Sequence, residues 1–220
     1  MDAAERPGAD GPAPEQQPTA RLASAERLKA FTDAVVAIAM TLLILPLMES
    51  VSEVAKEGGN AGDWVADNGD QLFSFALSFV LIAAFWLSHH RLFDRVHRVD
   101  GRLLVLTVVW MFTIVWLPVA TAIVGQMHND PVQKTLYIGS LFATSVVMTG
   151  LGWYALRHPE LHDMPRHSLR SGILADAIAS VLFALAYLST IAMPALSYYP
   201  MILLAVTGPL HSWLRRYLPG

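Results

Sequence analysis

The 220-residue sequence contains no cysteine, and only 15% of its residues are charged. The absence of thiols excludes disulfides, thiolate metal sites and cysteine nucleophiles. The sequence also lacks a glycine-rich phosphate loop, and no serine or threonine is accompanied by the base and acid that activate a nucleophile. We therefore predict no catalytic residues, no enzymatic activity and no cofactor.

Apolar residues are abundant instead, at 54% of the chain with a mean hydropathy of +0.44. This is too apolar for an ordinary soluble domain, so we predict an all-α integral membrane protein. Six segments are long enough to cross about 30 Å of hydrocarbon as helices. They are 28–48, 71–93, 103–125, 133–156, 169–193 and 196–214, and they form one transmembrane domain over 23–217, with a short end at 218–220.

Residues 1–22 differ from the rest, because they are rich in proline, glycine, alanine and acids. Such a segment buries too little apolar surface to fold, so we predict a disordered tail. Its acidic start and late hydrophobicity are unlike a secretory signal. We expect the first helix to remain in the mature protein.

The lysines and arginines are distributed unevenly about the six predicted spans. Of the 15, all except Lys56 and Lys134 fall on one side, and an acidic loop over 49–70 lies on the other. Positive charge is retained on the cytoplasmic side of membrane proteins. We therefore predict that both termini are cytoplasmic, and we place the chain in the cell inner (plasma) membrane.

The first predicted helix carries an apolar stripe formed by Ile38, Leu42 and Leu45 at i, i+4 and i+7, with Thr41 beside it. Stripes of this kind in membrane helices usually pack against neighbouring helices or lipid. Near the start of the same helix stands Asp33. Because a carboxylate inside a membrane is costly, this residue should have a partner and face protein or water.

Two blocks of the sequence together form a recognisable pattern. The first consists of Arg27, Phe31, Thr32, Asp33, Ile38 and Thr41, and the second of Trp86, His89, Arg91, Leu92 and Phe93. They resemble the signatures of the bacterial TMEM175-type potassium channels, with Thr32 in place of the usual serine. The dipeptide Leu117-Pro118 is also similar to that family, whereas Thr107 stands where an asparagine is expected.

This resemblance implies a homotetramer in which the first of six helices in each subunit lines a central pore for K⁺. It places the pore constriction at Ile38, continued by Leu42 and Leu45, with the hydroxyl of Thr41 beside it. A narrow ring of aliphatic side chains expels water and blocks ions without any charge. The sequence has no TVGYG-like carbonyl filter. We therefore expect only modest selectivity for potassium over sodium, with a contribution from Thr41.

The resemblance also implies an inter-helix network at the cytoplasmic end of the first helix. Its members are Arg27, Phe31, Thr32 and Asp33, tied to Trp86 and His89 on the second helix. Intramembrane charges pair in many proteins simply to hold helices together. For Asp33 we favour that structural role over direct ion binding.

The alternative function is a proton-coupled secondary transporter that uses Asp33, His89 and Asp176. Transporters of this kind show broken helices and paired repeats, whereas the first helix has no glycine or proline before Pro46. For Asp176 we expect a packing contact with Ser180 or a nearby threonine or tryptophan. Only the family resemblance argues against a membrane scaffold that conducts nothing.

The predicted partners are further copies of this chain and membrane lipid, and we expect no nucleic acid. Two histidines, His158 and His162, are four residues apart in a basic loop, a spacing that suits a metal site on a helix. Pro159 interrupts that turn and no HExxH pattern is present, so we predict no metal.

Overall fold

The computed structural model describes residues 19–127 and 130–192, and for 19–24 and 190–192 only the backbone. Every multi-residue secondary-structure element in this part of the chain is a helix. The helices are α1 (Thr19–Leu42), α2 (Leu45–Lys56), α3 (Ala61–Asp67), α4 (Gly69–Phe93), α5 (Gly101–Gln126), α6 (Pro131–Arg157) and α7 (Arg166–Ala192), with a 3₁₀ turn at Pro159–Leu161.

Five stretches of the described residues are long and apolar enough to cross a membrane. They are Ala25–Lys56, Gly69–Phe93, Gly101–Gln126, Pro131–Arg157 and Arg166–Ser189. The predicted sixth helix at 196–214, the end at 218–220 and most of the predicted tail lie outside the described residues.

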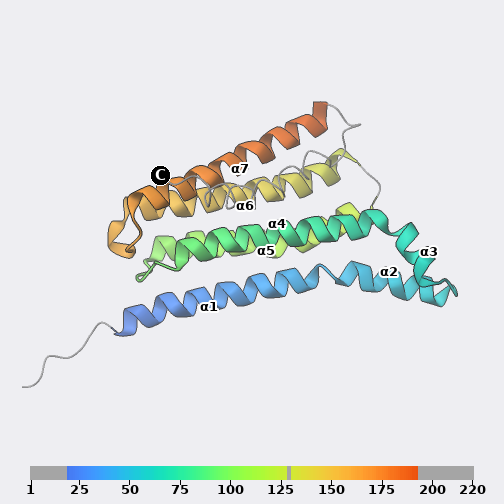
Figure 1. The fold of residues 1–220 in the computed structure, drawn as a ribbon, viewed down its shortest axis with the longest axis horizontal. Helices are drawn as coiled ribbons and strands as arrows, with labels where there is room; N and C mark the ends of the chain where they lie inside the picture. The colour runs from blue at the N-terminus through green and yellow to red at the C-terminus, as the bar shows by residue number, and fades with distance from the viewer. Residues whose placement is uncertain (1–18, 128–129, 193–220) are drawn as a thin grey trace, which may run out of the picture.

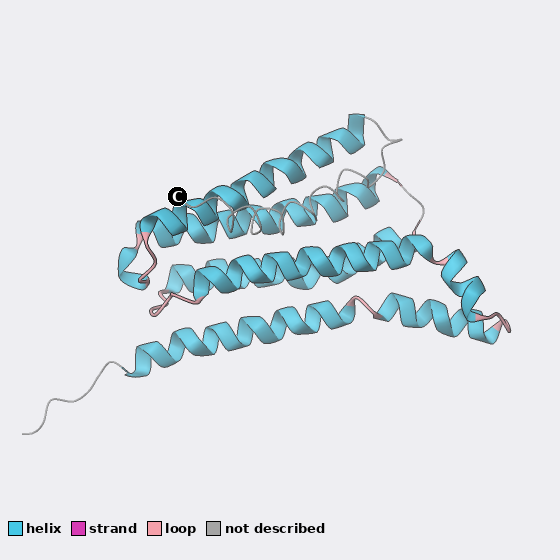
Figure 2. Cartoon of the chain, in the orientation of Figure 1, coloured by secondary structure: helices cyan, strands magenta, loops and turns pink. Residues whose placement is uncertain are grey.

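The long helices run side by side as one elongated bundle. α1 lies along one edge, α4 and α5 lie next to it, and α6 and α7 follow on the far side (Figure 1). Short loops join the helices at both ends of the bundle (Figure 2). α1 therefore contacts only α4 and α5 extensively, and one of its faces stays at the edge.

The first membrane segment differs from the predicted uninterrupted helix at 28–48. α1 ends at Leu42, a turn occupies 43–44, and α2 begins at Leu45. Pro46 explains the break, because proline has no backbone N–H and its ring clashes with the preceding turn. α1 also starts at Thr19, so residues 19–22, which were predicted to belong to the disordered tail, are helical.

α3 was not predicted, because it lies in the loop that we interpreted only by its acidity. It begins with a capping box in which the side chain of Asn60 accepts from the backbone N–H of Asp63, and the Asp63 carboxylate receives the N–H of Asn60. Its Trp64 Nε1 donates a 3.0 Å hydrogen bond to Ser50 Oγ, which fastens α3 to α2.

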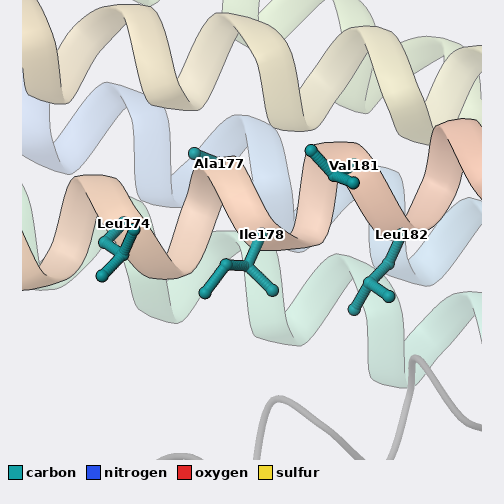
Figure 3. Close-up of a pocket in the computed structure, with 5 residues that line it drawn as sticks. All are labelled: Leu174, Ala177, Ile178, Val181 and Leu182. Carbon is teal, nitrogen blue, oxygen red and sulfur yellow. The ribbon is translucent and has the colours of Figure 1, made fainter.

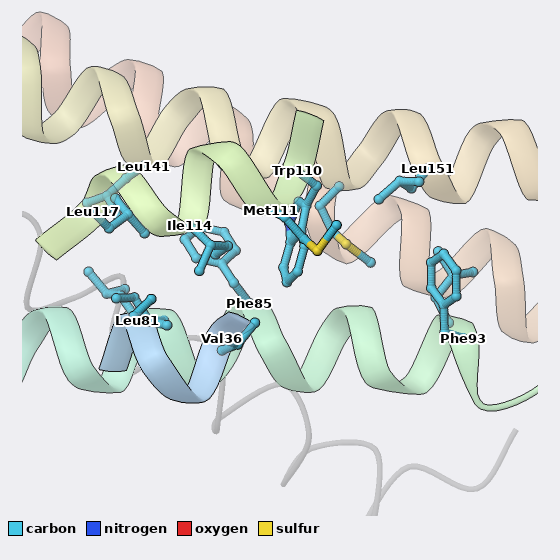
Figure 4. Packing of buried hydrophobic residues seen from close by; sticks show 14 of the residues in the cluster. Val36, Leu81, Phe85, Phe93, Trp110, Met111, Ile114, Leu117, Leu141 and Leu151 are labelled. Carbon is cyan, nitrogen blue, oxygen red and sulfur yellow. The ribbon is translucent and has the colours of Figure 1, made fainter. Parts of the chain in front are cut away.

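The core is centred on α5. Trp110, Ile114 and Leu117 of this helix are fully buried and lie between α4 and α6 (Figure 4). Three hydroxyl groups inside this core are paired with one another: Thr121 Oγ1 donates 2.8 Å to Ser78 Oγ, which is also 2.8 Å from the hydroxyl of Tyr137. These contacts fix α4, α5 and α6 to one another, so α1 packs on a firm surface.

Two loops meet at the end of the bundle where α1 begins, which we call the basic end because Lys29, Arg91, Arg95, Arg98, Arg102, Arg157, Arg166 and Arg170 lie there. The backbone N–H groups of His97 and Arg98 both donate to the carbonyl of Leu161, and Asp163 N–H donates to the carbonyl of Arg95. The loop between α4 and α5 is thereby joined to the loop between α6 and α7.

Candidate pore helix and its polar network

α1 has one buried face that follows the helical period. Its members recur every three or four residues and pack against α4 and α5: Ala25, Leu28, Thr32, Val36 and Ala39, continued by Leu43 in the turn after the helix. Thr32 is among them and is fully buried, with its hydroxyl donating 2.8 Å to the Leu28 carbonyl. These small and apolar side chains, together with Thr32, form the side of α1 that contacts the rest of the described chain.

The predicted constriction residues lie on the opposite face. Ile38 is 60% exposed, Leu42 39% and Leu45 49%, whereas Ala39, next to Ile38, is 1% exposed. The break at 43–44 falls inside this stripe, so Leu45 belongs to α2 and the other two to α1. The other described residues leave this aliphatic surface uncovered.

Thr41 lies on the same exposed face. Its Oγ1 donates a 2.7 Å hydrogen bond to the carbonyl oxygen of Ile38. The hydroxyl proton is therefore occupied within the helix, and the oxygen lone pairs remain available as acceptors. Such an oxygen can accept from water or contact a cation at the level of Ile38.

Asp33 joins α1 to α4. Trp86 Nε1 donates a 2.8 Å hydrogen bond to Asp33 Oδ1, and Nδ1 of His90 lies 4.0 Å from the same oxygen. One turn before, Lys29 Nζ donates 3.3 Å to the carbonyl of Asp94, just after α4. The side chains of Phe31 and Arg27, also on α1, are exposed.

The predicted tie between Asp33 and His89 is wrong. His89 is 1% exposed and stacks between the rings of Phe93, at 4.2 Å, and Trp110, at 4.3 Å. Its Nε2 has no hydrogen-bond partner within the described ranges. Trp86 and His90, four residues apart on α4, face α1 together, whereas His89 is turned toward α5. The doubled histidine in the sequence gave no means of choosing between the two.

On another side of α4, Ser88 Oγ donates a 2.8 Å hydrogen bond to Asp176 Oδ1 of α7. Ser180, which we expected to contact Asp176, donates to its backbone carbonyl and not to its carboxylate. Sequence reasoning missed Ser88, although it is a polar residue within an apolar segment and so needs a partner. Residues 86–90 of α4 thus contact two carboxylates, that of Asp33 on α1 and that of Asp176 on α7.

In the described part of the chain, no three His, Asp or Glu side chains come together in a group that could hold a metal ion. Nδ1 of His158 lies 2.9 Å from the carbonyl of Tyr154, and Nε2 of His162 lies 3.0 Å from that of Ala155. A hollow on α7 is lined only by apolar side chains: Leu174, Ala177, Ile178, Val181 and Leu182 (Figure 3).

Residues 27–118 match the sequence profile of the family described as "Endosomal/lysosomal potassium channel TMEM175". A potassium channel of Streptomyces collinus is 33% identical over 144 residues, which cover 62% of this chain and 67% of that protein. The chain belongs to the TMEM175 family. The matched region contains both polar blocks, from Arg27 to Thr41 and from Trp86 to Phe93.

Two further TMEM175 proteins show how far the likeness extends. Human "Endosomal/lysosomal proton channel TMEM175" is 27% identical over 206 residues, which are 89% of this chain but only 40% of the human protein. The crystal structure of "a lysosomal potassium-selective channel TMEM175 homolog" from Chamaesiphon minutus superposes with a TM-score of 0.61 at 24% identity, covering 86% of this chain and 98% of that one. This member of the TMEM175 family is therefore a multi-pass membrane protein with the fold of that homologue.

Proposed function

We propose that this chain is a potassium channel in which α1 of each of four copies lines a central pore. One observation carries the proposal: the predicted pore stripe lies on the face of α1 that the rest of the described chain leaves uncovered. Ile38 and Ala39 are neighbours in sequence, yet the first is exposed and the second is buried against α4 and α5. We take potassium as the permeant ion because the chain is similar to a bacterial potassium channel.

Several copies are required because one protomer has a single pore-type face and cannot enclose a path. The number four comes from the resemblance to the family. In the proposed homotetramer Ile38 forms the narrowest ring, with Leu42 and Leu45 continuing the wall. A ring of such side chains closes by dewetting and opens when the helices rotate or separate.

The break at 43–44 supports a gate of this kind. It interrupts the helix between Leu42 and Leu45, so α1 can change its tilt without carrying α2 and α3 with it. Selectivity for potassium over sodium is modest, because the ring is aliphatic and the Thr41 oxygen is the acceptor beside it. No cofactor takes part.

The proposed topology has six spans, with the segment at 196–214 as the last. Both termini are cytoplasmic, because the basic end of the bundle then faces the cytoplasm. The protein lies in the inner (plasma) membrane, and lipid covers the outward faces of α4 to α7.

The natural absence of cysteine makes a substituted-cysteine experiment clean. Ile38→Cys and Ala39→Cys are purified, reconstituted in planar bilayers and treated with a charged thiol reagent during recording. We expect unitary potassium currents from both, with block or a lasting fall in conductance only for Ile38→Cys. If the reagent, applied from either side of the bilayer, leaves the currents of both variants unchanged, Ile38 does not line the pore.

The same recordings separate the channel from the proton-coupled transporter. A carrier gives slow, saturable, proton-linked flux, whereas a channel passes many ions in each opening. In the described residues, hydrogen bonds do not join Asp33, His89 and Asp176 into a relay, since Asp33 is bound to Trp86 and Asp176 to Ser88.

A further inference from the structure

Trp153 and Arg157 lie about one turn apart on an exposed side of α6, near the end that leads into α7 (Figure 1). The guanidinium carbon of Arg157 lies 3.7 Å from the centroid of the Trp153 ring. The residues on either side of Trp153 in the sequence, Gly152 and Tyr154, are buried, whereas Trp153 is 49% exposed. The pair is therefore an exposed cation and aromatic ring at the end of the membrane segment Pro131–Arg157.

The side chain of Arg157 runs back along α6 toward the middle of the membrane segment. Its guanidinium lies over the ring of the residue four positions earlier, which corresponds to about 6 Å along a helix. An arginine at the end of a membrane helix usually extends outward, toward water. Tryptophan rings, in turn, are enriched at the depth of the lipid headgroups. Stacking on Trp153 therefore holds the positive charge of Arg157 at headgroup depth.

The stacked arrangement leaves the donor groups of the guanidinium accessible. A guanidinium contacts an aromatic ring through its flat face, and it binds a phosphate through the N–H groups at its edge, often two at a time. Arg157 is exposed, and the described ion pairs at 4.0 Å or less join other residues. The edge of the guanidinium can therefore receive a phosphate group while its face stays on the indole.

The charges around the pair favour a ligand with a net negative charge, because the pair belongs to the basic end of the bundle. Two acids of this end are engaged by other side chains: Asp100 accepts from the Tyr154 hydroxyl, and Asp163 contacts His97. A zwitterionic headgroup would bring an ammonium group into this positive field, whereas an anionic headgroup does not. Anionic lipids are also abundant in the cytoplasmic leaflet, the side on which basic loops are retained.

We propose that Arg157, held over Trp153, binds the phosphate group of an anionic phospholipid at the basic end of the bundle. The edge of the guanidinium receives the phosphate oxygens, and the exposed part of the indole packs against the upper part of the acyl chains. A free phosphate ion has no apolar part to cover the indole, which favours the lipid as the source of the phosphate. The site lies within one protomer and does not depend on ion conduction.

Fluorescence quenching by brominated lipid tests the site in the full chain. The protein is reconstituted in phosphatidylcholine bilayers that contain a minor fraction of phosphatidylglycerol with brominated acyl chains, or the same fraction of brominated phosphatidylcholine. Bromine quenches tryptophan only at close range, and the contribution of Trp153 is the part that is missing in Trp153→Phe. We expect brominated phosphatidylglycerol to quench Trp153 several-fold more strongly. Equal quenching by the two lipids overturns the proposal.

A pair of matched substitutions separates this site from a general attraction to the basic end. Arg157→Gln and Arg166→Gln remove the same charge, and Arg166 is exposed at the start of α7. Only Arg157→Gln should abolish the preference for phosphatidylglycerol. An equal effect of both substitutions, or a preference that survives in Arg157→Gln, overturns the proposal.

Arg157→Lys tests the stacked geometry, because lysine keeps the charge but lacks the planar group that stacks and binds at two points. It should lose most of the preference, and full retention would show that charge alone is sufficient, against a stacked site. Inorganic phosphate separates the two sources of the ligand. Replacing chloride by phosphate at constant ionic strength should leave the preference unchanged, whereas its loss would identify a site for the free ion and overturn the lipid assignment.

Discussion

The indole of Trp86 on α4 donates a 2.8 Å hydrogen bond to the carboxylate of Asp33 on α1. The contact lies at the depth where Ser88, half a turn further along α4, meets Asp176 of α7. Among the described helices only α4 and α5 pack extensively on α1, so this bond helps to hold the proposed pore helix against its own protomer.

Trp86→Phe tests that bond while retaining most of the ring. We expect a loss of about 1 kcal/mol in stability, which is typical of a hydrogen bond between membrane helices. It should be visible as a lower midpoint of thermal unfolding in detergent. Trp116→Phe, on an exposed position of α5, is the matched control and should leave the midpoint unchanged. Equal effects of the two substitutions would assign the loss to ring size alone.

Asp33→Ala should reduce the yield of assembled protein and leave ion preference unchanged. The substitution removes the acceptor for Trp86 and the neighbour of His90, so α1 is held less firmly. Size-exclusion chromatography and crosslinking measure assembly, and bilayer recordings of the remaining oligomers measure the potassium to sodium permeability ratio. Oligomers of normal stability with an altered ratio would instead give Asp33 a direct ion-binding role.

Thr41→Ala should lower the preference for potassium over sodium. The hydroxyl oxygen, whose proton is donated to the Ile38 carbonyl, is the acceptor next to the proposed constriction. The measurement is the reversal potential in a potassium and sodium gradient. Thr41→Ser keeps the oxygen and loses only a methyl group, so its reversal potential should match the wild type. An unchanged value in Thr41→Ala contradicts a role in selectivity.

The sequence predicted the helical pattern well where apolar runs are long. The predicted segment 103–125 lies within α5, and 133–156 lies within α6. The break after Leu42 was not predicted. Pro46 stands near the end of an apolar run, and a proline in that position does not show whether the helix stops or continues beyond it. α3 was missed because a short helix in a polar loop has no apolar period.

For the site, only part of the predicted set of contacts is present. The contact of Asp33 with Trp86 followed from two matched motifs. Helical spacing predicted an apolar stripe on α1, but by itself it favoured packing against neighbours, and only the family resemblance assigned the stripe to a pore. The choice of His90 over His89 did not, because adjacent residues on α4 point about 100° apart and only the packing of Trp110 shows which one is enclosed. Ser88 could be found only once α7 was placed against α4.

Gly152→Ala tests the close approach of α6 and α7. A Cβ at Gly152 would come within 2.8 Å of Cγ1 of Ile173, so that side chain or the helix must shift. We expect a loss of about 1–3 kcal/mol from overpacking, read as a lower unfolding midpoint. Gly150→Ala on the same helix is the control, since a Cβ there meets nothing within 4 Å. Adding Ile173→Ala should partly restore Gly152→Ala, and a failure to do so would place the strain elsewhere.

Asp100, which begins α5 at the basic end, should make the protein less stable in acid. Burial acts to raise the pKa of its carboxyl, but the hydrogen bonds from the Tyr154 hydroxyl and the Leu103 N–H, with His158 and Arg102 nearby, outweigh it and hold the pKa below its ordinary value.

A folded-state pKa below the unfolded one contributes stability above the unfolded value, about 3.9 for Asp, and loses it as pH falls through the folded value. Asp100→Asn retains an oxygen that can accept from Leu103 N–H and cap α5, but it does not titrate. Unfolding midpoints measured from pH 6 down to pH 3 should therefore decrease less steeply for Asp100→Asn than for the wild type. Tyr154→Phe should reduce the slope in the same direction, because it removes a donor that favours the ionised form. Parallel curves for all three proteins would show that other carboxylates control acid stability and that the contact between Tyr154 and Asp100 only positions α5 against α6.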